Sequence, residues 1–224
     1  MTLEHLILAN VDTLNDFMRM QGSLYVPGAK EIIPELKYLT DIGREYGIRT
    51  INLADSHNED SVEISDTPDG IITHPRHAMV GTWGAEFIAE TKPDKPYVLD
   101  WTSKFTDYAS VIEDIRASRE VVVKKDQTDS FGQRSYLPLV MEAVEPKTGV
   151  LYGVVSNICV DLVFDGFANN GMRLYVVTDA IMELPVDASL PREKRLATKG
   201  ELYDKWESAG AKLIEASEVV KYLG

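Results

Sequence analysis

Hydrophobic positions along this chain fall into short apolar runs, separated by longer stretches in which apolar residues recur with helical spacing. The apolar runs, typical of parallel strands buried on both faces, are Leu3–Val11, Arg49–Ala54, Glu120–Lys124, Val150–Val155, Arg173–Thr178 and Lys212–Ile214, with Tyr97–Leu99 as a short strand or extended piece. The stretches with helical character are Pro27–Tyr46, Gly84–Glu90, Asp107–Ser118, Tyr136–Val144, Pro191–Ala209 and Ser217–Leu223. This alternation predicts an α/β fold: one three-layer α/β/α domain over residues 1–224, with a mostly parallel sheet of about six strands.

The stretch Val150–Asn170 contains the only cysteine of the chain. Its opening strand gives way to a helix that starts near Ile158, with Ser156 or Asn157 as the expected N-cap. Cys159 therefore falls in the first helical turn, where free N–H groups and the helix dipole favour a thiolate over a thiol. A buried core cysteine without a chemical role is the alternative that this stretch alone leaves open.

Polar side chains follow several of the predicted strands, namely Asp12, Asp55, Lys124, Lys125 and Cys159. Because the carboxyl ends of parallel strands meet at one edge of a sheet, we expect these groups to converge there. Asp12 is then a candidate proton acceptor for the sulfur and Lys125 a candidate cation, with Lys124 as its neighbour in doubt. Backbone N–H groups between Val155 and Cys159 could stabilise an oxyanion. The alternative for each aspartate, taken by itself, is that it only caps a helix or contacts solvent and has no chemical role.

A second group of polar residues lies in the long segment Asn58–Thr82 and just before it, which we interpret as a functional loop. Three of the four histidines fall within 21 residues, beside several carboxylates: Asp55, His57, Glu59, Asp60, Glu63, His74 and His77. One carboxylate with two imidazoles suits Zn²⁺, Fe²⁺ or Mn²⁺. A polar loop with solvated histidines is the alternative. A non-haem iron protein that binds its metal through Asp55, His57 and His77 is a further alternative. It would leave the cysteine without a role and would require a β-rich scaffold.

Composition and charge narrow the class of protein. The chain has 224 residues, of which 44% are apolar and 26% charged, as is ordinary for a globular protein with one core. The net charge of −13 argues against nucleic acid or an anionic membrane as the partner. A single cysteine excludes an internal disulfide, the N-terminus lacks a leader-like segment, and no apolar run approaches the roughly 20 residues of a bilayer span. We therefore expect a cytoplasmic protein.

Six short motifs, spread from Leu3 to Ile181, carry a resemblance to a known family. They are V-D-T-L-N-D-F (Val11–Phe17), A-D-S-H (Ala54–His57), H-P-R-H-A-M-V-G-T-W-G-A-E (His74–Glu86), V-K-K-D-Q-T-D-S-F (Val123–Phe131), G-V-V-S-N-I-C-V (Gly153–Val160) and V-V-T-D-A (Val176–Ala180). In this order and spacing they resemble the isochorismatase-like cysteine hydrolases, and among them the nicotinamidases. The resemblance implies that family's fold and the hydrolysis of a small-molecule amide.

The resemblance also implies roles for individual residues. Asp12 would be the general base that takes the thiol proton and returns it to the leaving ammonia, and Lys125 would be the family lysine. Cys159 would attack the amide carbon to form a thioester, which water then hydrolyses. The family has a non-proline cis peptide before the cysteine turn, which corresponds to Val154–Val155 here. It would aim the oxyanion-hole N–H groups of Val155 and Cys159.

By the same resemblance, a divalent metal ion would be held by Asp55, His57 and His77, with Glu63 where some nicotinamidases supply a fourth ligand. Zn²⁺ is the metal we expect first, with Fe²⁺ or Mn²⁺ as alternatives. In those enzymes the ion binds the ring nitrogen of the substrate and orients it.

The substrate pocket would include Phe17, His74 and Trp83. His74 departs from the family pattern, because an aromatic residue is expected there, and Asp129 lies near a second expected aromatic position. Polar groups at these positions would weaken stacking on a pyridine ring. Hydrolysis of an acyclic ureido, carbamoyl or maleamate-type amide is therefore the alternative, and a non-catalytic interaction protein on the same fold is a third. The resemblance also implies a homo-oligomer.

Overall fold

A sheet of seven parallel strands forms the middle layer of the computed structural model, which describes residues 5–70 and 72–222. The strands are β1 (Leu6–Val11), β2 (Arg49–Asp55), β3 (Tyr97–Asp100), β4 (Glu120–Lys125), β5 (Thr148–Val154), β6 (Arg173–Met182) and β7 (Lys212–Ile214). Their spatial order is β3-β4-β2-β1-β5-β6-β7, and all neighbouring pairs are parallel. The predicted α/β fold with a mostly parallel sheet is confirmed. The strand number is seven because Tyr97–Asp100 pairs with β4 as a full strand.

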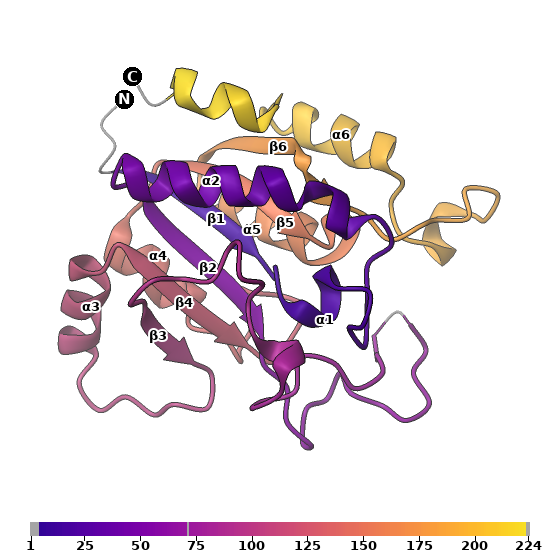
Figure 1. Cartoon of the computed structure of the whole chain (residues 1–224), viewed down its shortest axis with the longest axis horizontal. Coiled ribbons are helices and arrows are strands. Elements are labelled where there is room, and N and C mark those ends of the chain that lie inside the picture. The colour runs from indigo at the N-terminus through magenta and orange to yellow at the C-terminus, as the bar shows by residue number, and fades with distance from the viewer. Residues whose placement is uncertain (1–4, 71, 223–224) are drawn as a thin grey trace.

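Helices cover both faces of the sheet (Figure 1). One face packs against α2 (Ile33–Glu45) and the C-terminal 3₁₀ helix η6 (Ala216–Tyr222). The other packs against α3, α4, α5 and α6, which span Tyr108–Ala117, Leu137–Val144, Asp161–Asn169 and Lys199–Ser208. No helix of the described residues is long and apolar enough to cross a membrane.

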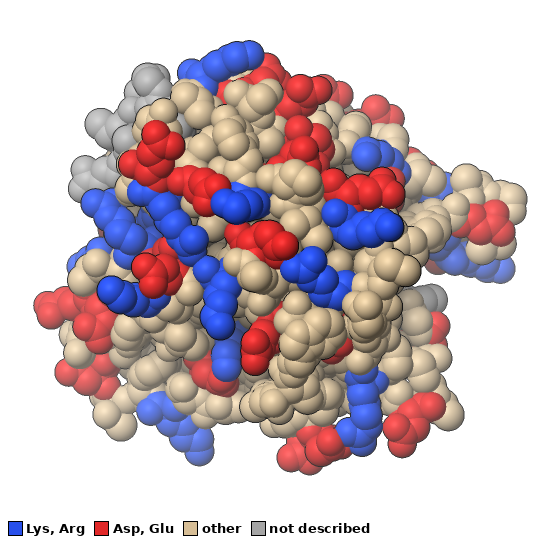
Figure 2. Space-filling view, viewed as in Figure 1, with Lys and Arg blue, Asp and Glu red and all other residues tan. Residues whose placement is uncertain are grey.

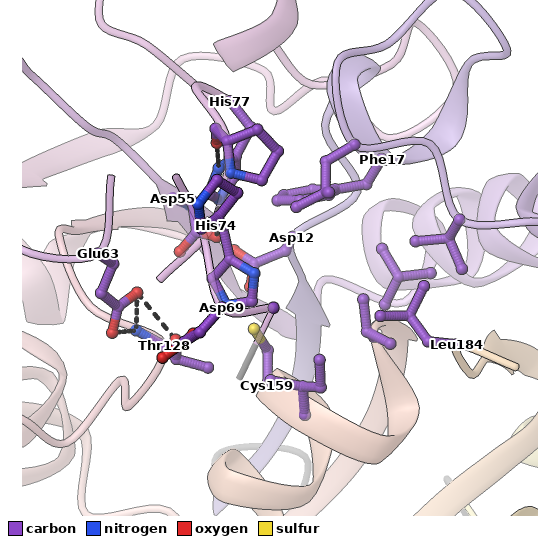
Figure 3. Close-up of a pocket in the computed structure, with 18 residues that line it drawn as sticks. Asp12, Phe17, Asp55, Glu63, Asp69, His74, His77, Thr128, Cys159 and Leu184 are labelled. Atoms are coloured by element: carbon purple, nitrogen blue, oxygen red, sulfur yellow. Dashed lines mark hydrogen bonds and ion pairs between the residues drawn. The ribbon is translucent and has the colours of Figure 1, made fainter. Parts of the chain in front are cut away.

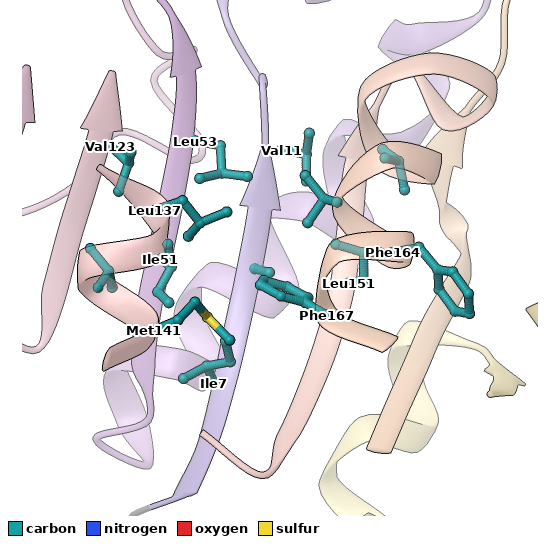
Figure 4. Close-up of a cluster of buried hydrophobic side chains, with 14 of the residues drawn as sticks. Ile7, Val11, Ile51, Leu53, Val123, Leu137, Met141, Leu151, Phe164 and Phe167 are labelled. Atoms are coloured by element: carbon teal, nitrogen blue, oxygen red, sulfur yellow. The ribbon is translucent and has the colours of Figure 1, made fainter. Parts of the chain in front are cut away.

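Strand β1 shows why the apolar runs are continuous. Leu6 and Leu8 point into the cluster beneath α2, whereas Ile7, Ala9 and Val11 point into the cluster on the opposite face. Because successive side chains of a strand point to opposite faces, a strand covered on both sides buries all of its positions and favours apolar residues on both faces. Figure 4 shows the second cluster, in which side chains from α4 and α5 pack against β1, β2, β4 and β5.

Several predicted helices differ from those observed. The segment after Asp12, for which no helix is predicted, contains the short helix α1 (Asn15–Met18), whose first N–H donates to the carbonyl of Glu86. The predicted helix Gly84–Glu90 is only the 3₁₀ turn η3 (Trp83–Ala85). Both differences arise from contacts between α1 and the distant η3 segment, which local patterns do not encode.

The predicted helix Pro191–Ala209 begins earlier in the chain than the observed helix. A 3₁₀ turn, η5 (Arg192–Lys194), is followed by extended residues, and α6 begins only after Thr198. Thr198 and Glu201 form a capping box there, which satisfies free N–H groups at the helix start. Similarly, α2 follows a 3₁₀ turn, η2 (Ala29–Ile32). Leu3 and Leu223, the outer ends of two predicted elements, lie outside the described residues.

Charged residues on the face that carries α2 are mixed in sign. Figure 2 shows Lys and Arg residues interspersed with Asp and Glu residues over this face. Several of them pair, including Lys37 with Asp41 within α2 and Arg44 with Glu120 at the start of β4. This face therefore presents mixed charge and no continuous basic surface among the described residues.

Candidate active site

A pocket of about 310 Å³ opens at the carboxyl ends of the central strands (Figure 3). Asp12 follows β1, Asp55 ends β2 and Cys159 lies in the turn after β5, and all three line the pocket. These three polar residues, which follow the predicted strands, thus lie together at one edge of the sheet, as expected. The pairing of β2 with β4 places Asp55 opposite Lys125.

The register also decides between the two neighbouring lysines. Lys125 is 0% exposed and lies beneath the pocket, with Nζ 3.1 Å from Oδ2 of Asp12 and hydrogen-bonded to Oδ1 of Asp55. Lys124 points to the opposite face, is 37% exposed, and lies 3.4 Å from Asp100. Since alternate residues of a strand face opposite sides, only one of the two can reach the site.

Asp12, Asp55 and Cys159 form a compact buried group around Lys125. One oxygen of each carboxylate and the Cys159 sulfur all lie within 4.8 Å of one another. Oδ1 of Asp12 accepts the backbone N–H of Asp55 at 3.0 Å, which fixes the carboxylate in place. The lysine ammonium is the cation that compensates two carboxylates taken out of water.

Burial sets the protonation of this group. Burial and the neighbouring Asp55 raise the pKa of Asp12 to about 6, although Lys125 opposes the shift. Burial also acts on Asp55, but there the ammonium of Lys125 and the two nearby histidines outweigh it and hold the pKa of the carboxyl well below its usual range. Burial raises the pKa of the Cys159 thiol, against the effect of Lys125. Burial thus opposes the thiolate expected at a helix start, and Asp12 lies beside the sulfur as a proton acceptor.

The cysteine turn itself differs from the expected capped helix. Residues Ser156–Val160 form a π turn that leads into α5, and neither Ser156 nor Asn157 caps it. The amide of Asn157 instead donates to the carbonyls of Leu184 and Ala197 and accepts the N–H of Leu184. Asn157 therefore ties the segment before α6 to the turn that carries the cysteine.

The peptide bond between Val154 and Val155 is cis, as the resemblance implied. The carbonyl of Val155 accepts the N–H groups of Ile158 and Val160, which closes the turn. The assignment of the Val155 and Cys159 N–H groups to an oxyanion hole stays a prediction.

Asp55, His57 and His77 form a second group on the far side of Asp55 from Lys125. Oδ2 of Asp55 lies 3.9 Å from Nε2 of His57 and 3.8 Å from Nε2 of His77. Two ligand atoms of one tetrahedral zinc ion lie about 3.3 Å apart, so small side-chain shifts would let these three atoms bind one ion. Nε2 of His57 is buried and has no hydrogen-bond partner among the described residues. The three residues therefore fit a divalent metal ion.

The outer nitrogens of the two imidazoles support this assignment. Nδ1 of His57 contacts the carboxylate of Asp126 at 3.1 Å, and Nδ1 of His77 contacts the carbonyl of Pro75 at 2.7 Å. Since both partners only accept, each Nδ1 carries a hydrogen, and Nε2 of a neutral ring then offers its lone pair. Burial lowers the pKa of His57, although Asp55 opposes it, which favours the neutral imidazole that binds metals.

Glu63, expected as a fourth ligand, lies elsewhere in the pocket wall. Its carboxylate accepts the backbone N–H of Thr128 at 2.9 and 3.0 Å and the Thr128 hydroxyl at 2.8 Å. It is not part of the metal-binding group that the described residues form. Glu63 therefore joins two loops at the pocket wall in this structure.

Of the three residues expected in the substrate pocket, two line it and one does not. Phe17 and His74 line the pocket, and the rings of both contact the ring of His77, with centroids 5.5 and 5.8 Å away. Figure 3 shows Phe17 and Leu184 on one side of the cavity, with Glu63 and Thr128 on the other. The structure does not place Trp83 there: it is 51% exposed and outside the lining, although its carbonyl accepts the side-chain N–H of Asn15.

Comparison with known proteins agrees with this geometry. The isochorismatase domain family matches residues 6–198. The chain belongs to the isochorismatase family. No curated protein sequence matches it.

Solved structures with the isochorismatase fold cover nearly the whole chain. N-carbamoylsarcosine amidase from Thermoplasma acidophilum is 23% identical, with a TM-score of 0.68 over 97% of this chain and 98% of its own. Nicotinamidase/pyrazinamidase from Bacillus subtilis is 21% identical, with a TM-score of 0.68 over 96% and 100%. Pyrazinamidase of Pyrococcus horikoshii, solved in complex with zinc, is 20% identical, with a TM-score of 0.68 over 94% and 99%. At these identities the likeness establishes the fold.

Two residues of this site were missed by sequence reasoning. Asp126 directly follows Lys125 at the end of β4, so its place after a strand was a usable signal. For Asn157 the sequence indicates only a role as a helix cap. Its contacts with Leu184 and Ala197 join segments 27 and 40 residues away, for which the sequence offers no local signal.

Proposed function

We propose that this protein is a cysteine amidohydrolase that releases ammonia from a small carboxamide, with nicotinamide as its substrate. The observation that supports this most strongly is the double role of Asp55. Its Oδ1 contacts Lys125 in the group that contains Asp12 and Cys159, and its Oδ2 faces the two histidines. A nucleophile with a proton acceptor thus lies directly beside a site for a metal ion, which, when bound, would hold the ring nitrogen of a pyridine carboxamide.

In the first half of the reaction, the carboxylate of Asp12 takes the thiol proton as the sulfur of Cys159 attacks the amide carbon. The tetrahedral oxyanion is assigned to the N–H groups of Val155 and Cys159. Asp12 then gives its proton to the amide nitrogen, the C–N bond breaks, and ammonia leaves a thioester. In the second half, Asp12 takes a proton from the water that attacks the thioester and returns it to the sulfur as the C–S bond breaks, which releases the acid and restores the thiol. Lys125 holds Asp12 in place throughout.

The charge of the pocket favours a neutral substrate. Its lining contains four carboxylates and, among the described residues, no lysine or arginine; the carboxylates are Asp12, Asp55, Glu63 and Asp69. Lys125 lies beneath and is already paired with two of them. An amide that bears its own carboxylate would meet like charge here without a lysine or arginine side chain to bind it. The apolar side with Phe17 and Leu184 suits one face of a flat ring.

The polar His74 opposite this side favours a second candidate substrate class, neutral acyclic amides. His74 is half-buried in the wall, where a ring that stacks would suit a pyridine better. The hydrolytic group would be the same for both substrate classes, since it involves only Asp12, Lys125 and Cys159.

Ammonia release from a panel of amides tests the proposal. The panel contains nicotinamide, pyrazinamide, maleamate, ureidoacrylate and N-carbamoyl compounds, and the protein is assayed as purified, after chelation and after zinc is restored. We expect turnover of nicotinamide that falls on chelation and returns with zinc. Turnover of acyclic amides alone would contradict nicotinamide as the substrate but would support the proposed cysteine mechanism. No turnover of any amide by reduced, zinc-supplied protein would refute the proposed function.

A further inference from the structure

Asp126 is a buried carboxylate that lies outside the pocket lining and directly behind His57. Its side chain is 0% exposed. Three side chains bond to it: His57 through Nδ1 at 3.1 Å, Ser61 through its hydroxyl, and Arg134 through Nη1 at 2.5 Å. Removing a carboxylate from water is costly unless its oxygens are paired, so this set of donors is what keeps the charge in place. None of these contacts takes part in the hydrolytic steps proposed above.

Arg134 makes two further contacts besides its bond to the Asp126 carboxylate. Its carbonyl accepts the backbone N–H of Asp126 at 3.2 Å, which closes the loop 126–134 on itself. Its guanidinium lies 5.2 Å from the ring centroid of Trp101, close enough for a cation–π interaction. The indole N–H of Trp101 in turn donates to the carbonyl of Ser56 at 2.7 Å. Arg134 and Trp101 thus connect Asp126 to the backbone of Ser56, which lies between Asp55 and His57.

This arrangement fixes the ring of His57. Because a carboxylate can only accept, Nδ1 of His57 must donate to Asp126, and the lone pair then lies on Nε2. That nitrogen is the buried atom without a partner, and it faces Oδ2 of Asp55. At His77, by contrast, Nδ1 contacts the neutral carbonyl of Pro75.

We propose that Asp126 is a positioning residue for the metal site: held by Arg134, it fixes His57 in the tautomer and orientation that bind a divalent metal ion. The inference rests on the metal site of the proposed function and extends it to residues beyond the ligands. A charged acceptor behind an imidazole makes Nε2 a stronger donor to a metal. Such outer contacts change metal affinity by about 10- to 100-fold in proteins.

Zinc binding by the full-length protein tests this directly, with a competing chromophoric chelator as the readout and no substrate present. Asp126→Asn keeps the size of the side chain and removes its charge, so we expect the zinc dissociation constant to rise by about 10- to 100-fold. Arg134→Ala leaves His57 and Asp126 in place and frees the carboxylate, so we expect a smaller rise in the same direction. Arg44→Ala is the matched control, because Arg44 is 41% exposed against 38% for Arg134 and pairs with Glu120 at the other end of β4.

A second readout separates positioning from general damage. The rate at which iodoacetamide alkylates Cys159 in metal-free protein should be the same in the wild type and both variants. Saturating zinc should restore turnover to Asp126→Asn. An unchanged zinc dissociation constant in folded Asp126→Asn would overturn the inference. If that variant does not fold, Arg134→Ala decides, and wild-type zinc affinity in Arg134→Ala would overturn it.

The outcomes for this inference and for the proposed function are distinguishable. A wild-type protein that hydrolyses amides without binding zinc would overturn the inference and leave the cysteine chemistry intact. Zinc affinity that falls as expected in the variants, in a protein that hydrolyses no amide, would support the inference and refute the proposed function.

Discussion

Replacing Lys125 by methionine should both destabilise the protein and stop catalysis. Lys125→Met keeps most of the buried side-chain volume but removes the ammonium that lies 3.1 Å from Asp12 and is bonded to Asp55. Two neighbouring carboxylates then remain buried without a cation. Breaking a buried ion pair by removing one partner costs about 3–5 kcal/mol. At about 2–4 °C per kcal/mol for a chain of this length, the melting temperature should fall by roughly 6–20 °C.

The matched control is the next residue in the chain. Lys124→Met removes a half-exposed ammonium 3.4 Å from Asp100, and exposed pairs of this kind contribute about 0–1 kcal/mol. Thermal and urea unfolding of the metal-free proteins at pH 7 measure the difference between the two variants. Equal losses of stability in Lys124→Met and Lys125→Met, or full activity in Lys125→Met, would refute the reasoning.

The pH dependence of this difference follows from the same contacts. Without the ammonium, the pKa values of Asp12 and Asp55 in folded Lys125→Met should lie above those of the unfolded chain. Groups of this kind favour the folded state at low pH, and that contribution is lost as the pH rises through their folded pKa values. The stability deficit of Lys125→Met relative to the wild type should therefore shrink between pH 7 and pH 5. A deficit that grows over this range would contradict the assignment of the charges.

Four further predictions concern the site. Cys159→Ala should fold normally and lose ammonia release by at least about 10⁴-fold, measured with any amide that the wild type hydrolyses. Asp12→Asn should lower kcat by about 10²–10⁴-fold with the thiol still titratable, because the proton acceptor is lost; a loss confined to KM would argue against that role. His57→Ala should remove bound metal, measured by elemental analysis, and raise KM for nicotinamide at least as much as it lowers kcat. Asn157→Ala should loosen the segment that carries Leu184 and raise KM more than it lowers kcat, whereas exposed Asn170→Ala should do neither.

Strand positions and the residues that follow them could be predicted from the sequence because both depend on local patterns. Buried parallel strands need continuous apolar runs, and the carboxyl ends of such strands must meet at one edge of the sheet. These two facts were enough to expect Asp12, Asp55 and Cys159 to lie together. The choice between Lys124 and Lys125 required the register of β4, which the structure supplies.

Features that depend on distant contacts could not be predicted in this way. Glu63 bonds to Thr128, 65 residues later in the chain, and is therefore turned away from the metal-binding group. Asn157 binds segments that follow it and not the free N–H groups of its own turn. Burial raises the pKa of Cys159, which opposes the local helix effect that the sequence suggested. In each case tertiary structure acts against a sound local expectation.

The central claim, a thioester on Cys159, is tested most directly by trapping the acyl group with hydroxylamine. Zinc-supplied protein is given either nicotinamide or an ester of nicotinic acid, and the hydroxamate and the free acid are measured at several hydroxylamine concentrations. After subtraction of the direct reaction between the ester and hydroxylamine, measured without enzyme, a shared acyl-enzyme predicts the same ratio of hydroxamate to acid for both substrates. The ratio should rise in proportion to hydroxylamine, and Cys159→Ala should give no product above that background. A ratio that differs between the two leaving groups, or hydrolysis that persists in Cys159→Ala, would mean that water attacks the substrate directly and would contradict the account.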